Sequence, residues 1–329
     1  MLALFRNNQT TTALLLAAYV GILHLPAITG WIAPPEIAAT TDGGLLYQHL
    51  FSWAKANPRG SAITAALLVL LQAILINALA DHFRLMNDRN WLPGMMYALA
   101  ASCLPDFLFL SPALVAVTFL PVALRRLFSV YKQKVAFGAI FDAAFWVTVA
   151  TLFHPPAVWF LPAVYFGLFS LRSFNLREQM VFYTGIFAPF FLALTAFFWL
   201  DRAGIYLHIQ FTRWIAIPAL VLPSDDWSLL KTGLIGLILL IVIMGFNVYY
   251  YKRLIQVQKY ITLFYWFLFA GLIAALFNPH MRLEYGLLLT PTLGVFLAYL
   301  FQSIRNGFLA EAFHLVLFAA ALSLQYLPH

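Results

Sequence analysis

Apolar residues run through this sequence in blocks of roughly twenty, and short clusters of polar residues separate the blocks. The core of a lipid bilayer offers backbone groups no water. Each block must therefore satisfy its own hydrogen bonds, as a helix of about 20 residues. The pattern predicts an all-α fold, a polytopic transmembrane helical bundle of about 10–11 spans.

The blocks place the expected spans as follows, with ends uncertain by several residues: 11–33, 61–82, 91–104, 108–124, 136–153, 156–173, 179–199, 231–251, 260–277, 285–303 and 309–327. Pro105 and Asp106 interrupt the apolar stretch 91–124. Either two short helices meet there in a tight hairpin or the region is re-entrant. We expect the whole chain, 1–329, to form a single transmembrane domain with long outer loops at 33–60 and 201–228.

Composition agrees with this pattern, because 63% of the residues are hydrophobic and only 9% are charged. Little sequence remains for a separate soluble domain. Cys103 is the only cysteine, which excludes an internal disulfide and a thiolate metal cluster.

The net charge of +7 is explained by where the basic residues lie. With the N-terminus on the cytoplasmic side, thirteen of the nineteen Lys and Arg residues fall in cytoplasmic segments and six in outer segments. The positive-inside rule favours this orientation in a bacterial inner (cytoplasmic) membrane. No basic surface remains for nucleic acid, so we expect none as a partner.

The second outer loop has apolar residues at every other position: Ile205, Leu207, Ile209 and Phe211. A period of two favours an extended interfacial segment over a helix there. In the first outer loop, residues Asp42 to His49 lead into a mildly amphipathic stretch that reaches Trp53.

Asp142 is the clearest charged residue inside an expected span. An ionised group at the bilayer centre costs about 3 kcal/mol, so Asp142 needs a partner. The first interpretation is a helix-to-helix hydrogen bond or a pair with Arg125, Arg126 or Arg172, and a proton or ion relay is the alternative. Other polar residues within the spans are interpreted as links between helices: Gln72, Asn77, Glu311 and His314.

The outer ends of the spans carry a denser set of titratable residues, which come from different connections and can meet at one membrane face. Such a set combines carboxylates for acid–base chemistry with arginines that bind phosphate. His280 and Glu284 are four residues apart, but no third ligand accompanies them, so no metal site is predicted. The candidates for substrate or lipid-phosphate binding are His154, Arg202, Arg213, His280, Arg282 and Glu284.

Several segments resemble an uncharacterised Bacteroidota family of multi-pass inner-membrane proteins. The resemblance implies a location and a number of spans but no function. The residues that carry it are Leu71-Gln72-Ala73 to Asn77, Pro105-Asp106, Phe141-Asp142, the stretch from Leu152 to Pro156 and the stretch from Leu171 to Glu178.

Residues 11–180 are also similar in layout to the GT-C superfamily of glycosyltransferases, which use polyprenyl-phosphate sugars. Those enzymes place a catalytic carboxylate in the first long outer loop and further polar groups in the next outer hairpin. The resemblance implies that Asp42 and Asp106 are catalytic, with Asp42 as general base or as the carboxylate that orients the acceptor. Arg202 or Arg282 would then hold the lipid phosphate.

We therefore expect a GT-C-like transfer of a sugar or related group at the periplasmic face, with no cofactor beyond a possible lipid carrier as substrate. Membrane lipids are the expected partners. One alternative is a non-catalytic subunit of an envelope secretion, motility or polymer-export complex, bound to other inner-membrane proteins. A transporter or flippase is the third. An enzyme predicts a pocket at Asp42 that opens sideways to lipid, whereas a subunit predicts a lipid-facing apolar seam filled by a partner helix.

Overall fold

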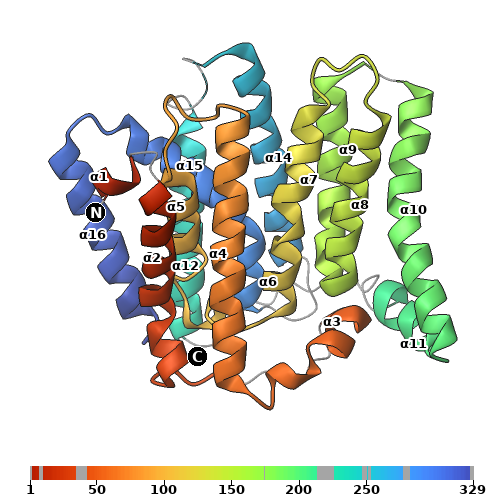
Figure 1. The fold of residues 1–329 in the computed structure, drawn as a ribbon, viewed down its shortest axis with the longest axis horizontal. Coiled ribbons are helices and arrows are strands. Elements are labelled where there is room, and N and C mark those ends of the chain that lie inside the picture. Colours follow the sequence, from red (N-terminus) through yellow and green to blue (C-terminus); the bar gives the residue numbers. More distant parts are fainter. Residues whose placement is uncertain are drawn as a thin grey trace.

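A computed structural model describes residues 2–6, 10–34, 43–173, 175–212, 226–246, 250, 253–276 and 282–326. These residues form an all-α bundle without strands, as predicted (Figure 1). In the list that follows, η marks 3-10 helices except for η5, which is a π-helix. The elements are α1 (Leu2–Phe5), α2 (Thr10–Thr29), α3 (Leu45–Leu50), η2 (Ser52–Ala54), α4 (Pro58–His82), α5 (Leu92–Ala100), η3 (Pro105–Phe107), α6 (Pro112–Val117), α7 (Phe119–Ser129), α8 (Phe137–Phe153), η4 (Pro155–Trp159), α9 (Phe160–Leu171), α10 (Leu176–Trp199), α11 (Ala203–Leu207), η5 (His208–Thr212), α12 (Asp226–Met244), α14 (Ile255–Leu276), η6 (Leu283–Leu289), α15 (Thr290–Ser303) and α16 (Gly307–Leu324).

The long helices lie side by side with their axes roughly parallel (Figure 1). Within the described residues, seven helical segments are long and apolar enough to cross a membrane, and three further apolar helices are shorter. Helix α2 begins at the upper end of the bundle in Figure 1, and α16 ends at the lower end. The prediction of a multi-pass helical bundle is confirmed.

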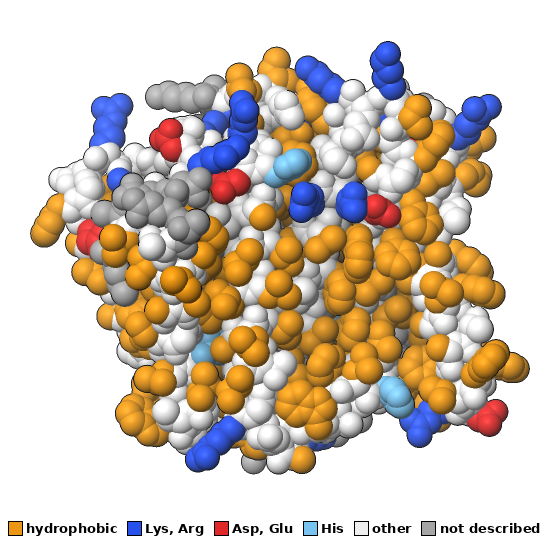
Figure 2. Space-filling view, viewed as in Figure 1, with side chains coloured by type: hydrophobic (Ala, Val, Ile, Leu, Met, Phe, Trp, Pro, Cys, Tyr) orange, Lys and Arg blue, Asp and Glu red, His pale blue; other side chains and the backbone are white. Residues whose placement is uncertain are grey.

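The two ends of the bundle differ in charge. The upper end in Figure 1 carries the connections α4–α5, α7–α8, α9–α10 and α15–α16, and basic side chains gather at the same end in Figure 2. Of the thirteen basic residues assigned to this side from the sequence, all except Lys252 are described. At the lower end, five of the six are described, and Arg213 lies outside the described residues.

The segment 91–111 crosses the bundle as a helix in its first half only. Helix α5 has nine residues, which at about 1.5 Å per residue covers less than half of a bilayer core. The irregular chain that follows it is buried, with Ala101, Ser102 and Leu104 at 0% exposure. The expected span 91–104 is therefore a short helix with a non-helical continuation. Helices α6 and α7 then form the next crossing.

Side chains from three other elements satisfy the backbone of this irregular segment. The hydroxyl of Ser61 accepts a bond from the Leu110 amide at 3.0 Å, and the hydroxyl of Tyr47 donates to the Leu110 carbonyl at 3.1 Å. The amide of Gln325 donates to the Ser102 carbonyl at 2.7 Å. Non-helical backbone is tolerated at membrane depth only where protein surrounds it in this way.

Polar side chains inside the bundle link helices, as the sequence indicated for Gln72 and His314. Gln72 donates to the Leu114 carbonyl at 2.8 Å and to the Thr118 hydroxyl at 2.7 Å, and it accepts a bond from the Tyr97 hydroxyl. His314 bonds to the hydroxyl of Tyr19 at 3.1 Å. Each bond joins elements that are distant in sequence, so these residues fix how the helices pack.

The second outer loop corrects the sequence analysis, because residues 203–212 are helical and not extended. Tyr206 and Gln210, four residues apart, are the buried positions, at 1% and 6% exposure. The alternating Ile205 and Leu207 are exposed. In a membrane an exposed apolar side chain can contact lipid, so the period of two did not mark the buried face. Residues 213–225 of this loop lie outside the described residues.

Helix α4 ends in a Schellman motif. The Leu85 amide donates to the Ala80 carbonyl at 2.9 Å and the Arg84 amide to the Asp81 carbonyl at 3.3 Å. This geometry places Arg84 at a φ of 49°, in the left-handed region that glycine adopts most easily. An arginine at this position costs about 1 kcal/mol relative to glycine.

Replacing Arg84 with glycine relieves that strain. We expect Arg84→Gly to raise the free energy of unfolding by about 0.5–1 kcal/mol. A thermal-denaturation comparison in detergent measures the effect. Arg305→Gly, at an exposed residue beyond the end of α15, is the control and should give no gain. A lower melting temperature for Arg84→Gly would contradict the assignment of strain.

Candidate functional site

Three short 3-10 helices, η3, η4 and η6, lie at the lower end of the bundle, and each precedes a membrane-crossing helix. Helix η6 packs against η3, α6, α12 and α14, and η4 packs against α8 and α14. These contacts bring together segments that are more than a hundred residues apart in sequence. The candidate site is built where they meet.

A buried ion pair joins α12 to η3. The Lys231 ammonium lies 3.5 Å from a carboxylate oxygen of Asp106, and the two side chains are 0% and 16% exposed. A side chain at Gly286 would place its Cβ 3.1 Å from the Phe107 ring and 3.3 Å from Ile235. Glycine at this position thus lets η6 lie close to η3 and α12, the two elements that carry the ion pair.

A second ion pair lies at the start of η6. The Arg282 guanidinium is 3.7 Å from the Glu284 carboxylate, and the two side chains are 23% and 16% exposed. Tyr47, in the outer helix α3, is close enough to respond to this carboxylate. Burial raises the pKa of the Tyr47 hydroxyl, and the negative charge of Glu284 raises it further. The first outer loop therefore lies near the same site as η6.

His154 is fully buried between α8 and η4, at 0% exposure. Its ring centroid lies 5.0 Å from that of Tyr285. Neither ring nitrogen has a hydrogen-bond partner among the described residues. Burial disfavours the charged imidazolium and lowers the pKa of His154 to about 3, so the ring is neutral at physiological pH. A neutral imidazole can offer one donor and one acceptor to a ligand.

An aromatic group lies beside the charged residues. Phe119 stacks on Trp146 and Phe153, with ring centroids 5.8 and 5.5 Å apart, and Tyr47 contacts Phe51 at 5.4 Å. Figure 2 shows a recessed hydrophobic surface in this region, above α3 and between α7 and α10. We call this surface the aromatic recess. Tyr47 and the Phe153–His154 junction connect it to the charged residues.

Two glycines dock the first outer loop against the end of α8. The Gly44 amide donates to the Phe153 carbonyl at 2.8 Å, and a Cβ at Gly44 would lie 1.9 Å from the Leu152 carbonyl oxygen. Gly43 lies against Tyr47 and Pro112. No larger residue fits at position 44 without moving the backbone. The glycines therefore fix how α3 joins the site.

Gly44→Ala tests this docking. Because the new Cβ overlaps backbone, we expect the free energy of unfolding to fall by about 2 kcal/mol or more. Thermal denaturation in detergent measures the loss. Gly138→Ala is the matched control, since a Cβ there meets nothing within 4 Å and alanine favours the helix by up to about 1 kcal/mol. Equal melting temperatures for the two variants would refute the close contact.

The structure brings four of the predicted site residues to one end of the bundle: Asp106, His154, Arg282 and Glu284. Arg202 is exposed at the start of α11, on the right-hand side of Figure 1, and none of the described contacts joins it to that group. Asp42, Arg213 and His280 lie outside the described residues. Among the residues described, no group of three or more His, Cys, Asp or Glu side chains is arranged to hold a metal ion.

Asp142 lies apart from the site, near the upper end of α8. Its carboxylate is 3.3 Å from the Arg126 guanidinium, and the two side chains are 34% and 52% exposed. Arg126 is one of the three partners that we predicted for Asp142 from the sequence. The ion pair near the membrane face explains why a carboxylate is tolerated within this helix, and no proton relay is needed to explain it.

Lys231 is the functional candidate that the sequence analysis missed. It was counted only as an outer basic residue, although it lies more than one turn inside the apolar helix α12. A lysine within such a helix is costly unless it has a partner. That cost was a usable indication, but nothing in the sequence identified Asp106, 125 residues earlier, as the partner.

Comparisons with family models, curated proteins and solved structures find no match for this chain. The class of protein therefore follows from the fold alone: the chain is a multi-pass helical membrane protein.

The contribution of the Lys231–Asp106 pair to the free energy of unfolding can be tested with variants of both residues. Asp106→Asn removes the carboxylate and leaves a buried ammonium, so we expect a loss of about 3 kcal/mol in the free energy of unfolding. Lys231→Met with Asp106→Asn removes both charges and should recover most of that loss. Denaturation of the two single variants and the double variant, combined as a double-mutant cycle, measures the coupling. Additive losses would contradict the pairing.

Proposed function

We propose that this protein is a GT-C-like transferase of a bacterial inner membrane, which uses a polyprenyl-phosphate-linked sugar or related group at the periplasmic face. The observation that carries the proposal is the junction of the aromatic recess with the buried charges at the lower end of the bundle. An amphiphilic substrate with a long apolar tail and a phosphate needs this combination of surfaces.

The parts of the substrate match the parts of the site. The apolar tail packs against the stacked rings of Phe119, Trp146 and Phe153. Arg282 binds the phosphate, and the buried ammonium of Lys231 adds positive charge nearby. The neutral His154 supplies a hydrogen-bond donor or acceptor without adding charge.

The reaction is a displacement at the carbon that joins the transferred group to the phosphate. A carboxylate, Asp42 in the first outer loop, accepts the proton of the acceptor hydroxyl. The hydroxyl oxygen then bonds to that carbon, the carbon–phosphate oxygen bond breaks, and the polyprenyl phosphate leaves with its charge stabilised by Arg282. Asp106, held by Lys231, orients the acceptor or the phosphate-binding residues.

The periplasmic location rests on the charge difference between the ends of the bundle. The end that carries the candidate site is the one with fewer basic residues, and the positive-inside rule assigns that end to the outer side. Thiol labelling of single cysteines placed at Lys55 and Lys134 in a Cys103→Ala background tests the assignment. Accessibility of both positions from the same side would contradict it.

The function is tested with the purified full-length protein and undecaprenyl phosphate. Native mass spectrometry should show one bound lipid per chain, and Arg282→Gln should weaken binding about tenfold, the effect of losing one charge-assisted contact to phosphate. Arg305→Gln is the control and should bind normally.

The catalytic assignment needs a second measurement. Lipid analysis of cells that lack the gene should show an accumulated polyprenyl-phosphate-linked group, and Asp42→Asn should not reverse the accumulation at unchanged protein level. A stoichiometric protein partner that co-purifies without any polyprenyl lipid would instead favour the subunit of an envelope complex.

A further inference from the structure

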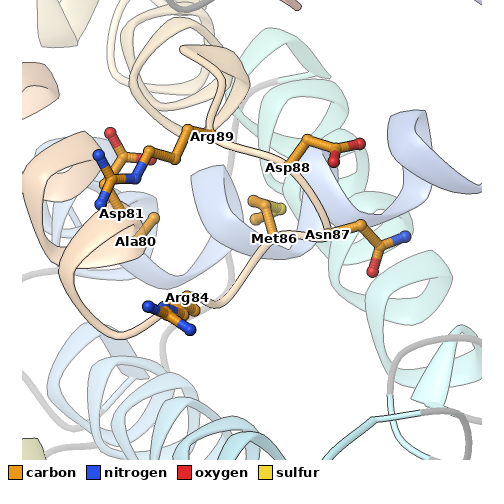
Figure 3. A pocket seen from close by; sticks show the side chains of 7 residues that line it. All are labelled: Ala80, Asp81, Arg84, Met86, Asn87, Asp88 and Arg89. Atoms are coloured by element: carbon orange, nitrogen blue, oxygen red, sulfur yellow. The ribbon is translucent and has the colours of Figure 1, made fainter.

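A second site lies at the other end of the bundle, away from the candidate active site. It is a pocket of about 330 Å³ between the end of α4 and the loop that leads to α5 (Figure 3). Its volume is at the lower end of the range for small-molecule sites, roughly 300–1,000 Å³. The residues that line it are Ala80, Asp81, Arg84, Met86, Asn87, Asp88 and Arg89.

The pocket carries charges of both signs in a small space. Two arginines and two aspartates line it, and Figure 3 shows the side chains of Arg89 and Asp81 extending toward one another. Met86 is buried at 6% exposure and provides an apolar surface. A simple anion would be repelled by the aspartates and a simple cation by the arginines. A zwitterion can satisfy both kinds of charge at once.

The walls of the pocket are held in place by contacts within the protein. Asn90 donates to the Asp88 carbonyl at 3.0 Å and accepts a bond from the Leu92 amide at 3.1 Å. Arg253, in the chain before α14, donates to the side chain of Asn87. A loop fixed in this way loses little conformational entropy when a ligand binds.

The Schellman motif that ends α4 fixes where Arg84 lies. The backbone of Arg84 is left-handed, with a φ of 49°, and its side chain lines the pocket. The end of the helix thus places a guanidinium beside the mixed charges.

We propose that this pocket binds the head group of a zwitterionic phospholipid, a phosphate ester that also carries a primary ammonium. Arg84 and Arg89 donate hydrogen bonds to the phosphate oxygens, and Asp81 and Asp88 accept hydrogen bonds from the ammonium. A primary ammonium fits better than a quaternary one, because carboxylates need N–H donors for these bonds. The site lies at the end of a 25-residue apolar helix, at the depth of the lipid head groups.

Native mass spectrometry of the purified full-length protein tests the proposal. The probes are 1-palmitoyl-2-oleoyl phosphatidylethanolamine, the matching phosphatidylglycerol and phosphatidylcholine, and soluble glycerophosphoethanolamine. We expect phosphatidylethanolamine to bind at least about fivefold more tightly than either other lipid, as loss of one charge-assisted hydrogen bond implies. Displacement by millimolar glycerophosphoethanolamine would assign recognition to the head group alone, whereas resistance to displacement would assign it to the lipid in its membrane setting. Either result supports the site.

Variants separate binding from folding. Arg84→Gly should weaken phosphatidylethanolamine binding by about fivefold or more although it stabilises the fold, and Asp81→Asn should abolish the preference over phosphatidylglycerol. Arg305→Gln, an exposed residue at the same end, is the control and should change neither quantity. Equal binding of the three lipids by the unaltered protein, or unchanged binding in Arg84→Gly, would overturn the proposal.

Discussion

The need to satisfy backbone hydrogen bonds away from water shapes this molecule more than any other constraint. Most of the chain meets it with helices, but residues 101–111 do not form a regular helix. They persist because Ser61, Tyr47 and Gln325 bond to their backbone and because the surrounding helices bury them. The same irregular segment carries Asp106. Residues 101–111 therefore supply a carboxylate to the candidate site.

The same principle explains where the other candidate residues lie. The helices η4 and η6 are short 3-10 segments at the ends of crossings, and His154, Arg282 and Glu284 lie beside them. At such ends, the backbone geometry changes and polar side chains approach one another without crossing the apolar core. Gly44 then allows the first outer loop to pack at a distance that a side chain would prevent, and Gly286 lets η6 lie close to η3 and α12. Chemistry and close packing are therefore concentrated at one end of the bundle.

Much of the fold could be predicted from the sequence, because blocks such as 61–82 and 179–199 have a length and composition that only a membrane-spanning helix satisfies. The convergence of Asp106, His154, Arg282 and Glu284 could be expected only as a shared membrane face. Their ion pairs and contacts depend on tertiary packing, which one sequence does not reveal. Lys231 was missed because a single lysine near a helix end looks like an ordinary interfacial residue. Residues 203–212 were misjudged because apolar periodicity marks the buried face only where water surrounds the protein.

The distance along the chain between Asp106 and Lys231 has a consequence for biosynthesis. The carboxylate is synthesised and delivered across the membrane 125 residues before its ammonium partner emerges from the ribosome. Until α12 inserts, the α5–α6 connection lacks the ammonium that lies beside its carboxylate in the finished fold. Completion of this end of the protein therefore depends on the late insertion of α12.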